Sequence, residues 1–96
     1  MVAHIFWTSL ALKDLSDIRE YIQKDNPRAG RQEAGKIKSS VERLKSFPLS
    51  GRPSPDILGV REVVKNPYRI FYRVRSKNIE ILRIYHEKRN LTGIAL

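Results

Sequence analysis

The dipeptide Asn26-Pro27 stands between two amphipathic stretches and sets the plan of the first half of the chain. A proline disfavours helical geometry at the residue before it, and it fits the first position of a new helix, where no backbone N–H is needed. Asn26 is therefore the expected N-cap of a second helix. Two helices joined this tightly form an antiparallel hairpin.

Apolar residues recur at spacings of three and four on both sides of this joint. Such spacings place each set on one face of a helix. We expect a first helix over residues 9–24, with Thr8 or Ser9 as its N-cap, and a second over residues 27–46. The two sets are Ala11, Leu15, Ile18 and Ile22, and Ala34, Ile37, Val41 and Leu44.

The rest of the chain has the composition of strands and one stiff loop. Residues 3–7 are short and β-prone, and residues 47–59 hold three prolines and two glycines, which is typical of a loop. Further strands are expected over residues 60–65, 68–75 and 79–86, with turns at Asn66-Pro67 and at residues 76–78. The order is β-α-α-β-β-β. It predicts an α+β fold in which the N-terminal strand and the helical hairpin pack on one face of a small antiparallel sheet.

Period-two alternation assigns side chains to the two faces of the predicted sheet. The strand over 68–75 has an apolar face, formed by Tyr68, Ile70, Tyr72 and Val74. Its other face is mainly basic and is formed by Arg69, Phe71, Arg73 and Arg75. On the last strand, the same rule separates Leu82, Ile84 and His86 from Ile79, Ile81, Arg83 and Tyr85. Both faces of the last strand are partly apolar, which favours an inner position in the sheet.

Length and composition exclude several classes of protein. The 96 residues predict one domain over 1–96, which rules out a multidomain enzyme or a Rossmann domain. No apolar run approaches the ~20 residues of a membrane helix, and the first residues lack the pattern of a signal peptide. With no cysteine and only two histidines, we expect a cytoplasmic protein without metal, cofactor or small-molecule substrate.

Positive charge increases along the chain. The formal net charge is +9, and residues 61–90 carry nine basic against three acidic side chains, whereas residues 1–30 carry four of each. This asymmetry favours an acidic or polyanionic partner for the C-terminal half, although a basic surface can also serve solubility alone.

Four residues are candidates for phosphate chemistry. Arg61, Arg69 and Arg89 are expected to converge on the sheet face opposite the helices, where their charges could stabilise a developing phosphorane. His86 could transfer the proton. The alternative is a carboxylate-binding or solvated arginine face, with His86 packed at a strand end on Tyr85 or Tyr68.

A basic surface with apolar spots is the expected binding face for a partner protein. Apolar spots at Phe71, Leu82 and Ile84 would suit an acidic segment that folds on binding. The candidate partner- or target-binding residues are Arg69, Phe71, Arg73, Arg83, Tyr85, Lys88 and Arg89.

Several stretches together resemble the RelE/ParE superfamily of bacterial toxins. They are DLSDIREYI at 14–22, NPRAG at 26–30, SGRPSPDILGVREVV at 50–64, YRIFYRV at 68–74 and IEILRIYHEKR at 79–89. The resemblance covers nearly the whole chain in order. It implies a growth-inhibiting toxin of a type II toxin–antitoxin system, of the kind linked to plasmid stabilisation, which a small acidic antitoxin neutralises.

The resemblance is closer to the ParE-like branch, whose members poison DNA gyrase and perform no RNA chemistry. It implies that this chain is not an enzyme. The alternative is a RelE-like, ribosome-dependent mRNA endonuclease, metal-independent and using attack by the 2′-hydroxyl, for which Arg61, Arg69, His86 and Arg89 would be catalytic. Only Arg61 is basic in VREVV, and LTGIAL lacks the late tyrosine of many RelE-like members. A third hypothesis is a toxin-like relic or a plain nucleic-acid-binding module.

Overall fold

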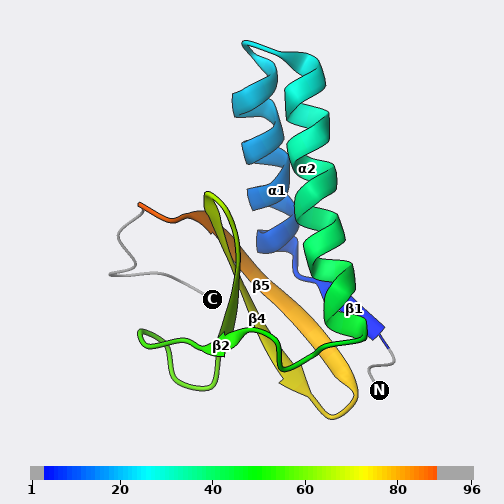
Figure 1. Ribbon diagram of the computed structural model, residues 1–96, viewed down its shortest axis with the longest axis vertical. Helices are drawn as coiled ribbons and strands as arrows, with labels where there is room; N and C mark the ends of the chain where they lie inside the picture. Colours follow the sequence, from blue (N-terminus) through cyan, green and yellow to red (C-terminus); the bar gives the residue numbers. More distant parts are fainter. Residues whose placement is uncertain (1–3, 89–96) are drawn as a thin grey trace.

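The computed structural model describes residues 4–88, which form a helical hairpin over one twisted sheet (Figure 1). The elements are β1 (His4–Trp7), α1 (Ser9–Gln23), α2 (Pro27–Glu42), a 3₁₀ turn η1 (Arg43–Lys45), β2 (Arg52–Pro53), β3 (Arg61–Lys65), β4 (Tyr68–Arg75) and β5 (Asn78–His86). The predicted element order is confirmed. The short strand β2 was not predicted, because it lies inside the proline-rich loop.

Both helices begin where side-chain caps place them. The Oγ1 atom of Thr8 accepts a hydrogen bond from the Ala11 N–H at 3.1 Å, and Oδ1 of Asn26 accepts one from the Ala29 N–H at 3.1 Å. Pro27 occupies the first turn of α2. The second helix was predicted over residues 27–46, and the prediction is correct as far as Glu42. Beyond it the chain forms the tighter 3₁₀ turn η1 instead of a further α-helical turn.

The sheet has the strand order β1-β5-β4-β3-β2. Strands β2 to β5 pair antiparallel, whereas β1 lies parallel to β5. The expectation that the N-terminal strand packs on a face of the sheet is wrong, because β1 is an edge strand of the sheet itself. Its parallel pairing with β5 makes the sheet mixed instead of purely antiparallel. The inner position predicted for the last strand is confirmed, since β5 lies between β1 and β4.

One face of the sheet packs against the helices and holds the main core. Figure 1 shows α1 and α2 side by side, with the end where they join projecting beyond the sheet. The buried members of this cluster come from both layers: Ala11, Leu15, Ala34, Ile37, Val41, Leu44, Tyr68, Ile70, Tyr72, Ile79, Ile81 and Ile84. The expectation that the hairpin covers one face is confirmed, and so is the face predicted for Tyr68, Ile70 and Tyr72.

A β-bulge at Leu82 changes the faces of β5. Phe71 is opposite Arg83 and Tyr72 is opposite Ile81, so Leu82 has no partner in the ladder. The extra residue shifts the alternation. Ile79 and Ile81 consequently share the helix-facing core with Ile84, and the two faces predicted for this strand are wrong beyond the bulge.

The opposite face of the sheet carries a smaller apolar cluster under a loop. Buried Val60, Phe71, Leu82 and Tyr85 pack together with Ile57. The loop before β3 is anchored from the helix side, because the Tyr72 hydroxyl donates to the Pro48 carbonyl at 2.8 Å and accepts from the Gly51 N–H at 2.9 Å. Within residues 4–88, no helix has the length and apolar content needed to cross a membrane.

Candidate functional site

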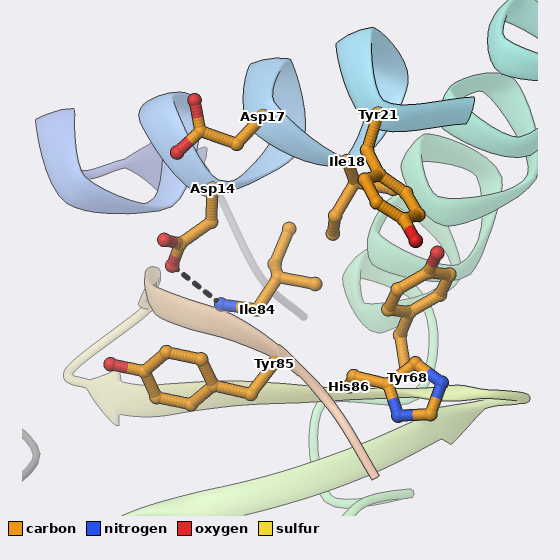
Figure 2. Close-up of a pocket in the computed structure, with 8 residues that line it drawn as sticks. All are labelled: Asp14, Asp17, Ile18, Tyr21, Tyr68, Ile84, Tyr85 and His86. Carbon is orange, nitrogen blue, oxygen red and sulfur yellow. Dashed lines mark hydrogen bonds between the residues drawn. The ribbon is translucent and has the colours of Figure 1, made fainter. Parts of the chain in front are cut away.

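A hollow of about 510 Å³ lies between α1 and the ends of β4 and β5 (Figure 2). We call it the α1–β5 groove. Figure 2 shows the rings of Tyr21 and Tyr68 converging over it. Tyr21 is 76% exposed, so its ring is available to a partner. The residues that line the groove are Asp14, Asp17, Ile18, Tyr21, Tyr68, Ile84, Tyr85 and His86.

Asp14 closes one side of this groove by binding the free edge of β5. Strand β1 ends at its Trp7–Ile81 pair, and beyond it Asp14 Oδ2 accepts the Ile84 N–H at 3.0 Å. The same carboxylate binds Arg83 in two places, at 2.8 Å to Nε and 2.9 Å to Nη2. These hydrogen bonds raise the pKa of Arg83.

His86 lies exposed at the other end of the groove. Its ring meets Tyr68 edge-on, with 5.8 Å between ring centroids, and its Nδ1 accepts the Lys88 N–H at 3.2 Å. Burial, helped by the negative charge of Glu33, raises the pKa of Tyr68. Of the two readings of His86, the structure places it as a strand-end histidine packed on Tyr68.

On the sheet face opposite the helices, Glu62 is buried between two arginines. Its side chain has no exposed area, and Arg52 Nη2 and Arg69 Nη2 each lie 2.6 Å from one of its oxygens. Arg69 also reaches Asp56 at 3.2 Å, and its guanidinium stands 5.1 Å from the centroid of the Phe71 ring. Burial lowers the pKa of Arg69, but the hydrogen bonds that it donates to Glu62 and Asp56, with the negative charges of both carboxylates, outweigh burial and raise the pKa. This network fixes Arg69 and neutralises it.

The predicted convergence of arginines is wrong for Arg61 and Arg69. Arg61 pairs in register with Tyr72 of the main core, while Arg69 lies on the opposite face with Glu62 and Phe71. The Arg61 side chain instead donates to the Gly51 carbonyl at 2.8 Å. Arg89, the third predicted member, lies outside the described residues.

The predicted binding face is largely occupied by contacts within the chain. Phe71, Leu82, Ile84 and Tyr85 are all buried, so the predicted apolar spots are not exposed. Ile84 even belongs to the helix-facing core.

The remaining arginines of this face have carboxylate partners. Arg73 and Arg75 each contact Glu80 at 3.2 Å, and Arg83 is held by Asp14 and lies over the Tyr85 ring. Lys88 is exposed. The basic face expected of the C-terminal half is therefore mostly a set of ion pairs.

Sequence reasoning missed the carboxylates that neutralise these arginines. Asp14 and Arg83 are separated by 69 positions, so no local pattern joins them. Glu62 did offer one signal in the sequence. It alternates with Val63 on a short strand, so the two side chains point to opposite faces of the sheet. A carboxylate on a covered face is expected to pair with a cation. Within residues 4–88, no group of three or more His, Asp or Glu side chains is placed to hold a metal ion.

Known proteins match this chain over most of its length. Y4kP, a candidate toxin of Sinorhizobium fredii, is 42% identical over 84 residues, covering 85% of each chain. Toxin RelE2 of Caulobacter vibrioides is 38% identical over 89 residues, covering 92% of this chain and 99% of its own.

A solved structure of the same architecture comes from the chromosomal ParDE toxin–antitoxin system of P. aeruginosa. It has a TM-score of 0.77 and 31% identity, and covers 90% of this chain and 96% of its own. The family described as the ParE toxin of the type II toxin–antitoxin system parDE matches residues 5–91. The chain therefore belongs to the ParE toxin family and is a type II toxin of the ParE/RelE superfamily.

Proposed function

We propose that this toxin inhibits growth by binding and poisoning DNA gyrase in the cytoplasm, and that a cognate acidic antitoxin neutralises it. The choice of gyrase over mRNA as the target rests on the ion pairs of Arg69. Its guanidinium is fixed between Glu62 and Asp56 at 2.6 and 3.2 Å, at a site where the alternative function requires a cation free to meet phosphate.

Metal-free cleavage of RNA depends on cations gathered around the reacting phosphate and on a placed proton donor or acceptor. Here Arg61 and Arg69 lie on opposite faces of the sheet. His86 is exposed and packed on Tyr68, at the end of the α1–β5 groove. An arrangement of this kind favours a toxin that acts through binding over one that cuts RNA.

The antitoxin is supported by the relatives. The P. aeruginosa match is described as a ParDE toxin–antitoxin system, and this chain carries a formal charge of +9 that an acidic protein complements. The open α1–β5 groove, with the exposed ring of Tyr21, offers apolar contact area for such a partner.

Induced expression separates the two targets. Gyrase poisoning predicts filamentous cells and DNA-damage signalling, whereas mRNA cleavage predicts rapid translation arrest with mapped cuts. The substitution His86→Ala provides the matched variant, because the side chain is exposed and we expect the fold to tolerate its loss. We expect this variant to remain toxic within about twofold of the parent chain.

The proposal is contradicted by translation arrest with mapped mRNA cuts that His86→Ala abolishes. Co-expression with the small acidic protein of the neighbouring gene should restore growth, and growth that stays arrested would refute the antitoxin assignment.

A further inference from the structure

Among the described residues, most cations of the sheet have carboxylate partners, whereas most cations of the helical hairpin have none. On the sheet, Arg52, Arg69, Arg73, Arg75 and Arg83 each have a carboxylate within 3.2 Å. In the described part of the chain, five exposed cations of α1 and α2 have neither an ion pair nor a side-chain hydrogen bond: Arg19, Arg28, Arg31, Lys36 and Lys38. Helical geometry turns Lys36 about 100° away from Gly35, so we call the other four the hairpin stripe.

Three members of the stripe surround one hollow. Arg19 of α1 and Arg31 and Lys38 of α2 line a volume of about 230 Å³ at the seam of the two helices. Ala34 and Gly35 complete the lining, which includes no carboxylate. Arg31 and Lys38 are two helical turns apart, about 10 Å along the axis, and Arg28 lies one turn before Arg31. The three α2 cations of the stripe therefore follow one side of a rigid helix, and Arg19 of α1 lies beside them.

Gly35 leaves the middle of the stripe open. A Cβ atom added at Gly35 would meet nothing within 4 Å, so no packing contact requires a glycine there. A glycine inside a helix costs about 0.5–1 kcal/mol relative to alanine. What its missing side chain provides is access, since a bulky anion can approach the helix between Arg31 and Lys38.

The chemistry of this face favours nucleic acid over protein. Protein interfaces have an apolar or aromatic centre, and no large apolar side chain lines the hollow of the stripe. Leu12 of α1 is exposed in a neighbouring hollow that Arg19 and Lys38 also line. Cations alone suffice for a phosphate backbone, and arginine binds phosphate with two parallel hydrogen bonds. We propose that the hairpin stripe binds the backbone phosphates of duplex DNA, whichever protein the toxin targets.

The test is fluorescence anisotropy of the purified full chain with a labelled 20-base-pair duplex over a series of salt concentrations. Each phosphate contact contributes about 0.9 to the slope of log affinity against log salt. The double variant Arg31→Gln/Lys38→Gln should lower this slope by about 1.8 and weaken binding at least about tenfold at low salt. The control Arg73→Gln/Arg75→Gln removes the same net charge from the sheet and should leave the slope unchanged.

A second pair of variants tests the position within the stripe. Gly35→Glu and Gly35→Gln have the same shape and differ in charge, and both side chains enter open space. We expect Gly35→Glu to bind the duplex at least about tenfold more weakly than Gly35→Gln.

Three results would overturn the proposal. They are the absence of duplex binding at low salt, an equal fall in slope for the hairpin and sheet double variants, and tighter binding of an acidic peptide or a single-stranded RNA than of the duplex at this stripe. None of these measurements involves gyrase, so failure here is distinct from failure of the proposed target.

Discussion

At the scale of single residues, two carboxylates determine how much positive charge the sheet can offer. Glu62 is shared by Arg52 and Arg69, and Asp14 neutralises Arg83 while it binds a backbone N–H of β5. A count of charges along the sequence does not separate paired cations from unpaired ones. The basic C-terminal half was therefore predicted correctly as composition, but most of its described arginines are held in ion pairs within the chain.

Asp14 gives a residue-scale prediction with a control on the same helix. The side chains of the Asp14–Arg83 ion pair are nearly buried, with Asp14 11% and Arg83 13% exposed. Those of the Lys13–Asp17 ion pair are open to solvent, with Lys13 71% and Asp17 56% exposed. Asp14→Ala leaves the buried Ile84 N–H without its acceptor and should lower the free energy of unfolding by about 2–3 kcal/mol. Asp17→Ala should change it by less than about 0.5 kcal/mol. Urea denaturation measures both, and equal losses would refute the role given to Asp14.

At the scale of elements, the two glycines of α2 should respond in opposite ways to alanine. A Cβ at Gly30 would lie 2.8 Å from the Arg19 carbonyl oxygen, because the two helices approach closely there. We expect Gly30→Ala to destabilise the chain by about 1–3 kcal/mol and Gly35→Ala to stabilise it by about 0.5–1 kcal/mol. Thermal unfolding measures the two shifts. A stabilising Gly30→Ala would contradict the packing of the hairpin.

The elements also show where sequence patterns fail. Helix caps and the joint at Asn26-Pro27 are local, and they were predicted because one or two residues decide them. The bulge at Leu82 is decided by pairing across β4 and β5, so simple alternation wrongly separated Ile84 from Ile79 and Ile81. The parallel pairing of β1 is likewise a consequence of the crossover, and no pattern within residues 3–7 encodes it.

At the scale of the whole molecule, the order and spacing of elements were enough for the family and the α+β fold. The family match spans residues 5–91, so the separation of Arg61 and Arg69, which contradicts their predicted convergence, leaves the family assignment intact. The candidate site was less predictable, because the α1–β5 groove and the hairpin stripe both arise from segments that only the packed structure brings together.

A gyrase assay tests the central claim most directly. Purified toxin is mixed with gyrase and supercoiled plasmid, and linear DNA is measured after protein digestion; a parallel reaction supplies programmed ribosomes and maps mRNA ends. Our account predicts linear DNA that increases with toxin and disappears when the antitoxin is added first, with intact mRNA in the parallel reaction. Intact plasmid beside cut mRNA would contradict it.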